Sequence, residues 1–222
     1  MLSNKRLTIL CGHYGTGKTN VAVNLALAMA GAGERVTVAD LDIVNPYFRT
    51  LDSADAFADA GIRLICSRFA NTNVDIPSLP PDLYAITDDK NHRVVIDVGG
   101  DDSGAMVLGR LAPAIREEND YAMWLVVNQY RPLTPDIPST LEVMREIETA
   151  AGLTFTGIVN NSNLGAETTA DVVRDTLGYA EQLATAAGLP LVATTVAEDV
   201  YPDLEGEIAN LTPLKLQNNK PF

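Results

Sequence analysis

One segment constrains what this chain can fold into more than any other: Gly12-His13-Tyr14-Gly15-Thr16-Gly17-Lys18-Thr19. It matches the phosphate-binding pattern G-x-x-x-x-G-K-[ST] at every required position. The apolar run over 7–11 is typical of a buried strand, and the apolar residues after the loop recur at helical spacing. A strand, a glycine-rich turn and a helix together form a cradle of backbone N–H groups for phosphate oxygens. The segment therefore predicts a nucleoside triphosphate site, with Lys18 on the β- and γ-phosphates and Thr19 on Mg²⁺.

Apolar runs alternate with helical patterns along almost the whole chain. We expect strands at 6–11, 35–39, 62–66, 93–98, 121–128, 154–160 and 191–196, and helices at 18–32, 47–60, 104–118, 136–151, 168–188 and 199–210. Such alternation predicts an α/β fold: a doubly wound, mostly parallel sheet with helices on both faces, in three layers. The 222 residues fit a single domain over 1–222, with a long loop over 67–82 and a C-terminal tail over 212–222.

Charge and cysteine content argue against several classes of site and partner. A net charge of −13 without a cluster of Lys and Arg argues against a nucleic-acid partner. The two cysteines, Cys11 and Cys66, exclude a four-cysteine metal site within one chain and fit a reducing compartment. No apolar stretch approaches the ~20 residues that cross a bilayer, and the run after Arg6 is too short for a signal peptide. We therefore expect a cytoplasmic protein that contacts neither nucleic acid nor membrane.

Acidic residues close two other expected strands, at the edge of the sheet where the phosphate loop should lie. The second strand ends in Asp40-Leu41-Asp42, and the fourth ends in Asp97, which two glycines follow closely. An aspartate that closes an apolar strand is the usual Walker B arrangement, which holds Mg²⁺ directly or through water. A single aspartate at such a place is also a common loop or cap residue. Beside a phosphate loop, however, the three carboxylates together predict a metal site.

The three motifs resemble the MinD/ParA/Mrp group of P-loop ATPases, which also includes the nitrogenase iron protein and the nucleotide domain of cobyrinate diamide synthase. The resemblance is specific at G-H-Y-G-T-G-K-T, D-L-D-I-V-N-P and V-V-I-D-V-G-G. It implies that ATP is bound by Gly12 through Thr19 and the adjacent Asn20. It also implies that Asp42 orients or activates water, that Asp40 lies near the metal shell, and that Asp97 is the Walker B aspartate.

The resemblance continues less specifically toward the C-terminus. It implies that Asn160 or Asn161, after the sixth strand, contacts adenine, although an asparagine there is also a common turn residue. It further implies that the backbone around Val196 and Ala197, after the seventh strand, lines the base.

One departure from the family pattern concerns the second and third positions of the loop. MinD and ParA have a signature lysine where this chain has His13, and a glycine where it has Tyr14. In the family that lysine crosses a nucleotide-sandwich dimer and neutralises charge on the partner's phosphates. A histidine is only partly cationic near neutral pH, so Arg49 or Arg68 could supply the charge instead, or His13 could simply cap the loop. Formation of an ATP-dependent homodimer is therefore left open.

Two polar segments, 128–132 and 160–164, follow the fifth and sixth strands on the expected ligand side. The first includes Tyr130 and Arg131. Such segments can meet a nucleotide or a second substrate, form a surface for a partner, or be ordinary surface loops.

The leading functional hypothesis is a Mg²⁺-dependent ATPase, slow without a partner, that acts as a molecular switch on an unidentified partner protein. DNA segregation is disfavoured by the acidic charge, membrane cycling by the lack of a basic amphipathic tail, and metal-cluster loading by the lack of C-x-x-C. The alternative is an ATP-dependent carboxylate ligase resembling dethiobiotin synthetase or the cobyrinate enzymes, which also lack the signature lysine. A third hypothesis is a slow nucleotide-gated adaptor whose main activity is binding.

Overall fold

The computed structural model describes residues 3–41, 53–66, 81–100 and 102–216. Its strands are β1 (Leu7–Cys11), β2 (Val36–Asp40), β3 (Arg63–Cys66), β4 (Arg93–Asp97), β5 (Tyr121–Val127), β6 (Gly157–Asn160), β7 (Leu191–Ala197) and β8 (Leu211–Leu214). They form one sheet in the order β3-β2-β4-β1-β5-β6-β7-β8, with every neighbouring pair parallel. Because β1 lies in the middle and the chain winds outward from it in both directions, the phosphate loop that follows β1 lies at the centre of the carboxyl edge.

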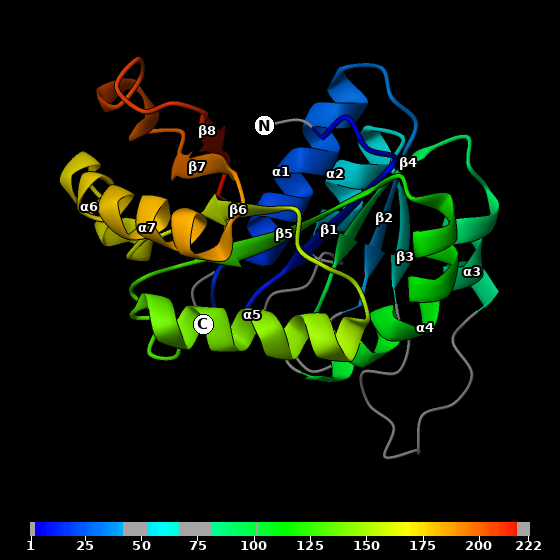
Figure 1. Ribbon diagram of the computed structural model, residues 1–222. Helices are drawn as coiled ribbons and strands as arrows, with labels where there is room; N and C mark the ends of the chain where they lie inside the picture. The colour runs from blue at the N-terminus through cyan, green and yellow to red at the C-terminus, as the bar shows by residue number, and fades with distance from the viewer. Residues whose placement is uncertain (1–2, 42–52, 67–80, 101, 217–222) are drawn as a thin grey trace, which may run out of the picture.

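Helices cover both faces of this sheet (Figure 1). They are α1 (Lys18–Gly31), α2 (Ala54–Asp59), α3 (Pro81–Asp88), α4 (Asp102–Glu118), α5 (Ile137–Ala151), α6 (Ala170–Asp175) and α7 (Leu177–Ala187). Apolar residues of α3, α4, α5 and α7 pack on one face, and those of α1 and α2 pack on the other. The doubly wound, three-layer α/β fold predicted from the alternating pattern is confirmed.

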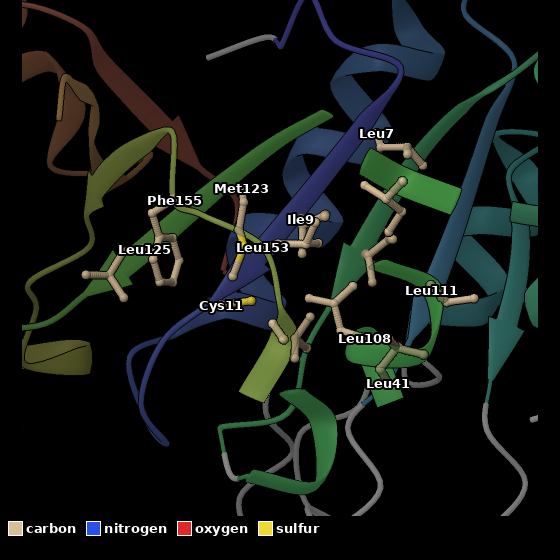
Figure 2. Packing of buried hydrophobic residues seen from close by; sticks show 14 of the residues in the cluster. Leu7, Ile9, Cys11, Leu41, Leu108, Leu111, Met123, Leu125, Leu153 and Phe155 are labelled. Carbon is tan, nitrogen blue, oxygen red and sulfur yellow. The ribbon is translucent and has the colours of Figure 1, made fainter. Parts of the chain in front are cut away.

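Strand β1 shows how the two faces are filled. Leu7, Ile9 and Cys11 point into the cluster that includes Leu108 of α4, as Figure 2 shows, whereas Leu10 belongs to the cluster against α1. Successive side chains of a strand point to opposite faces, so a strand that is covered on both sides is buried at every position and is mostly apolar; in β1 the polar exception is Thr8. This burial explains why the central strands are continuous apolar runs in the sequence.

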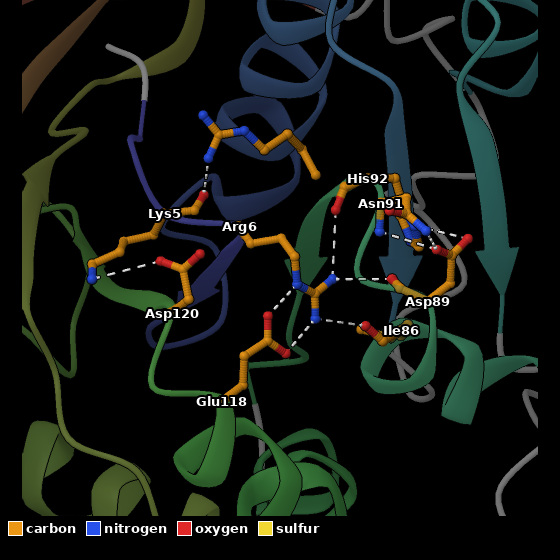
Figure 3. A network of polar contacts seen from close by, with 9 residues as sticks. Lys5, Arg6, Ile86, Asp89, Asn91, His92, Glu118 and Asp120 are labelled. Carbon is orange, nitrogen blue, oxygen red and sulfur yellow. Dashed lines mark hydrogen bonds and ion pairs between the residues drawn. The ribbon is translucent and has the colours of Figure 1, made fainter.

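A buried arginine holds the amino-terminal edge of the sheet, opposite the phosphate loop (Figure 3). Arg6 directly precedes β1, and its guanidinium forms a two-pronged ion pair with Glu118 at the end of α4. It also donates to the carbonyl of Ile86 in α3, at 3.0 Å. Because this buried charge is both paired and hydrogen-bonded, it can tie β1, α3 and α4 together.

Two C-terminal segments differ from the sequence expectation. Residues 211–214 form β8 at the edge of the sheet, whereas 212–222 was expected to be a tail. An edge strand tolerates Pro213, which has no N–H to donate. The helix expected over 199–210 is only a 3₁₀ turn at Tyr201–Asp203, because Gly206 and Asn210 adopt φ values of 81° and 58° that end helical structure.

Two other helical segments also differ. Helix α3 was not expected from the sequence; it begins at Pro81, inside the loop expected over 67–82, where proline suits the first helical position. The single helix expected over 168–188 divides into α6 and α7 at Thr176, whose hydroxyl donates to the carbonyl of Val173 at 2.8 Å. Residues 47–52 and 67–80, which include parts of an expected helix and loop, lie outside the described residues. No helix in the described ranges is both long and apolar enough to cross a membrane.

Candidate functional site

The phosphate loop has a backbone that only glycine adopts easily. Gly12, Gly15 and Gly17 have φ values of 150°, 78° and 85°. A side chain would also collide at two of these positions, because a Cβ on Gly12 would overlap the carbonyl oxygen of Val126 and one on Gly17 would overlap the amide of Asn161. The loop therefore requires glycine for its conformation and for the close approach of neighbouring strands.

Helix α1 starts at Lys18 and presents its first backbone N–H groups toward the loop. Its N-cap residue is Gly17, which has no side chain to cap the helix, and its first turn has no acidic residue. By contrast, α5 and α6 are capped by Asp136 and Thr169. Since the first N–H groups of a helix lack partners within the helix and lie at the positive end of its dipole, α1 offers them to an anion.

A single carbonyl group inside the loop, that of His13, organises the two polar side chains behind it. The hydroxyl of Thr16 donates to it at 2.9 Å, and the ammonium group of Lys18 donates to it at 3.2 Å. Lys18 is only 6% exposed, so its charge is held across the loop where phosphate oxygens would lie. The ring of His13 lies with Nδ1 3.2 Å from the carbonyl oxygen of Tyr14.

A cavity of about 510 Å³ opens beside the loop, within the range of ~300–1,000 Å³ that is usual for small-molecule sites. The predicted residues that line it are Tyr14, Gly15, Gly17, Lys18, Thr19, Asn20, Asn161, Val196 and Ala197. The other described lining residues are Arg131, Asn163, Gly165, Ala166, Thr168, Thr195, Leu214 and Leu216. The cavity thus joins the phosphate loop to the carboxyl ends of β6, β7 and β8.

The structure separates the two asparagines that follow β6. Asn160 is buried away from the cavity, and its amide donates to the hydroxyl of Thr176 at 3.1 Å. Asn161 lines the cavity, donates to the carbonyl of Thr16 at 2.7 Å and accepts from the hydroxyl of Thr195 at 2.6 Å. An amide has two N–H donors and two acceptor lone pairs, so Asn161 can hold the loop and still face a bound base.

The predicted metal residues come from the end of the phosphate loop and from the ends of two strands. Asp40 and Asp97 are paired in register at the ends of β2 and β4 and are 4% and 1% exposed, while Thr19 lines the cavity. Asp42 lies outside the described residues. Within the described ranges, no group of three or more His, Cys, Asp or Glu could hold a metal ion by itself. This oxygen-donor set fits Mg²⁺ that takes its remaining ligands from nucleotide phosphates and water.

The thiol of Cys11, at the end of β1, is not available as a nucleophile. Burial raises its pKa far above the usual range, although the nearby ammonium of Lys18 acts in the opposite direction. The thiol is therefore neutral at physiological pH and serves as a small apolar group in the core.

A second cavity, of about 520 Å³, borders the phosphate loop at His13 and shares none of its described lining residues with the first. Its lining includes His13, Gly99 and Gly100, and Glu142 and Glu146 from α5. A Cβ on Gly100 would lie 2.5 Å from the backbone nitrogen of Tyr14 in the phosphate loop. The segment after β4 therefore packs directly on the phosphate loop.

Residues after β8 contribute to the site in a way that the sequence analysis missed. The side chain of Asn24 in α1 accepts from the backbone N–H of Lys215 at 2.8 Å and donates to its carbonyl at 3.0 Å. This pairing holds Leu214 and Leu216 where they line the nucleotide cavity. A contact between residues 191 positions apart leaves no local pattern in the sequence. Arg49 and Arg68, considered as substitutes for the missing lysine, lie outside the described residues.

Several solved structures share the fold. FtsY from Mycoplasma mycoides is similar at a TM-score of 0.60 with 17% identity, over 88% of this chain and 62% of that chain. Cell division protein FtsY from Thermotoga maritima is similar at 0.58 with 19% identity, over 88% and 63%. The signal recognition particle 54 kDa protein from Aeropyrum pernix K1, in complex with GDP, is similar at 0.54 with 16% identity, over 86% and 41%. The chain thus spans about three fifths of the FtsY chains that it matches.

At sequence identities of 16–19%, the similarity to these solved structures establishes the fold alone. No curated protein matches the chain in sequence. The profile of the CobQ/CobB/MinD/ParA nucleotide binding domain, CbiA, matches residues 7–200, which contain the phosphate loop and the ends of β1, β4, β6 and β7. The chain therefore belongs to the CobQ/CobB/MinD/ParA family of P-loop nucleotide-binding domains, as its three motifs predicted.

Proposed function

We propose that this chain is a Mg²⁺-dependent switch of the MinD/ParA type that binds and hydrolyses ATP and acts on a partner protein. One observation carries the proposal: the amino terminus of α1, the ammonium of Lys18 and a cavity of nucleotide size meet at one place. The chain as a whole has a net charge of −13, so a site lined by positive groups is a local exception. Such a site is suited to a polyanion rather than to a cation.

The polar groups of the cavity favour adenine over guanine. Adenine presents a neighbouring donor and acceptor, at N6 and N7, which an amide side chain can pair with. Asn161 and Asn163 place amides in the lining, and each uses one N–H and one oxygen lone pair within the chain, which leaves one of each for a base. Guanine also presents N–H donors that suit a carboxylate, and no aspartate or glutamate occurs among the described lining residues.

Hydrolysis at this site requires positioning and neutralisation of charge rather than covalent chemistry. Lys18 and the loop N–H groups would hold the phosphates, and Thr19 and Asp97 would hold Mg²⁺, which would neutralise charge on the β- and γ-phosphates. Asp42 is the residue that we propose to orient the attacking water. Because Gly100 packs on the backbone of the loop, departure of the γ-phosphate could be passed to the segment after β4, which would provide the switch.

The ligase alternative gains support from the second cavity beside the loop, which has room for a small acceptor molecule. Its lining, however, includes Glu142 and Glu146, which would repel a carboxylate substrate. The switch therefore remains the better-supported function.

The first test is ATP and GTP turnover, measured with Mg²⁺ together with solution mass. Lys18→Ala should lower turnover by about 100-fold or more, since one phosphate-contacting donor is worth that much in similar sites. Asp42→Ala should retain ATP binding but lose turnover. Lys90→Ala, which removes an exposed lysine outside both cavities, is the matched control and should behave like the native chain.

Three outcomes would contradict the proposal in different ways. If the native chain binds no nucleotide, the function is wrong. Preference for GTP would overturn the assignment of adenine. Release of ADP only when a small carboxylate is supplied would establish the ligase instead.

A further inference from the structure

Arg131 lies in the loop between β5 and α5, and its guanidinium packs on the phosphate loop. A Cβ on Gly15 would be 3.3 Å from its Nε and 3.4 Å from its Cζ. The same arginine lines the nucleotide cavity together with Lys18 and Thr19. Two cationic side chains from distant parts of the sequence therefore border the space where the phosphates would bind.

The backbone around Arg131 is fixed by a completely buried asparagine. The carbonyl of Asn128 accepts from the N–H of Arg131 and from the hydroxyl of Thr134, each at 3.1 Å. Its side-chain oxygen accepts from the N–H of Tyr130 at 3.0 Å, and its amide donates to the carbonyl of Asn163 at 3.1 Å. The turn that carries the arginine is thus bonded to itself and to the loop after β6.

Two further bonds anchor this turn from outside. The N–H of Gln129 donates to the hydroxyl of Ser162 at 3.0 Å, and the hydroxyl of Tyr130 donates to the carbonyl of Val172 at 3.1 Å. A guanidinium that projects from such an anchored turn loses less conformational freedom on binding a ligand than one on a free loop.

The charge of Arg131 is not balanced within the described structure. None of the ion pairs there includes it, whereas Arg6, Arg63, Arg93 and Arg174 each pair with a carboxylate. The described lining of the cavity contains no acidic residue. An arginine that is anchored by its backbone, unpaired in its side chain and placed beside a phosphate loop is suited to phosphate oxygens, which its planar fork can bind with two hydrogen bonds.

We infer that Arg131 is a phosphate-contacting residue that acts with Lys18 on the nucleotide bound by the same chain. This inference rests on the proposed function, because it requires the cavity to hold a nucleoside triphosphate. It identifies a source of positive charge within the described chain, at a loop where His13 occupies the second position.

The test compares Arg131→Ala and Arg131→Gln with the native chain in calorimetric titrations with ATP and with inorganic tripolyphosphate. Both variants should bind each ligand about 10- to 100-fold more weakly, which is the usual effect of losing a charge-assisted hydrogen bond. Arg131→Lys should recover part of the affinity, because it restores the charge without the fork. Arg110→Ala, which removes an exposed arginine of α4 outside the cavity, should bind as the native chain does.

Protein concentrations are kept where solution mass shows a monomer, so that an arginine from a second copy cannot account for the effect. Thermal unfolding of each variant, and the glutamine variant in particular, shows whether the exposed substitution has disturbed the fold.

The outcomes separate this inference from the proposed function. If Lys18→Ala loses affinity and both neutral Arg131 variants do not, the role of Arg131 is wrong and the function stands. Equal weakening by Arg110→Ala, or a loss for ATP without a loss for tripolyphosphate, would also overturn a phosphate contact. If the native chain binds neither ligand, the proposed function itself fails.

Discussion

The amide of Asn161 connects the phosphate loop to the ends of β6 and β7, and truncation to alanine should destabilise the folded chain measurably. The change removes the bond to the Thr16 carbonyl at 2.7 Å and the bond from the Thr195 hydroxyl at 2.6 Å. Asn161 is 6% exposed, so water replaces these bonds only in part. The loss is therefore a property of the nucleotide-free protein and can be measured without knowing the ligand.

The magnitude follows from the fate of each partner. Each lost bond is worth about 1 kcal/mol net. The Thr195 hydroxyl retains the carbonyl of Asn160 at 3.2 Å as an acceptor, so it adds no further penalty. The carbonyl of Thr16 loses a buried donor, which adds up to about 1 kcal/mol where the cavity admits water. The free energy of unfolding should fall by about 2–3 kcal/mol, and a chain of this size should melt roughly 5–10 °C lower.

Urea denaturation and thermal melting without nucleotide provide the measurement. Thr195→Val removes the hydroxyl's bond to Asn161 and its 3.2 Å bond to the carbonyl of Asn160, and should cost about 1–2 kcal/mol, with non-additivity of about 1 kcal/mol in the double variant. Asn91→Ala, which alters an exposed asparagine at the opposite edge, is the control. If Asn161→Ala melts within about 2 °C of the native chain, or if the double variant is additive, these bonds do not join the loop to the strands.

Three other substitutions test separate parts of the structure. Gly100→Ala would place a Cβ 2.5 Å from the nitrogen and 2.7 Å from the Cα of Tyr14, so the phosphate loop must move. ATP affinity, measured by titration, should then fall at least about tenfold. Unchanged affinity would contradict the close packing. Glu118→Gln leaves the buried charge of Arg6 without its carboxylate, so the free energy of unfolding measured in urea should fall by about 3 kcal/mol. A fall of less than about 1 kcal/mol would show that the pair is not buried as described. Burial, assisted by the neighbouring charge of Arg6, lowers the pKa of His92 below its usual 6.5 despite the nearby Asp89. The unfolded chain therefore binds more protons, so stability should be complete above pH 6.5 and fall as the pH drops below it, and His92→Asn should flatten this dependence; an unchanged slope would refute the assignment.

The fold was predictable because the apolar composition of each central strand indicates that both of its faces are buried. A central strand such as 121–127 has apolar residues on both faces, and its flanking segments show helical spacing. Strand β8 escaped prediction because an edge strand is short, half exposed and tolerant of Pro213. At the break between α6 and α7, the Thr176 hydroxyl donates to the carbonyl of Val173 and accepts from the amide of Asn160, and the second of these bonds comes from a distant strand end that the local sequence does not express.

The site divides in the same way. The phosphate loop is contiguous, so its pattern alone predicts its residues and their conformation. The rest is assembled from contacts across the fold: Asn161 reaches the loop across 145 positions, and Asn24 reaches Lys215 across 191. The sequence marked 128–132, which includes Arg131, as a polar segment on the ligand side. The position of Arg131 over Gly15, however, depends on the turn built around Asn128. These positions follow from the order of the strands, which local patterns do not determine.

The pairing of Asn24 with the backbone of Lys215 affects how a newly synthesised chain acquires its site. These residues are 191 positions apart, so at ~5–20 residues per second the ribosome adds Lys215 about 10–40 s after Asn24. During that interval the phosphate loop and α1 exist without the wall that Leu214 and Leu216 later provide. A nascent chain can offer a cradle for phosphates before it can enclose a nucleoside. Enclosure of a bound nucleoside therefore depends on the docking of β8, which is synthesised well after the phosphate loop.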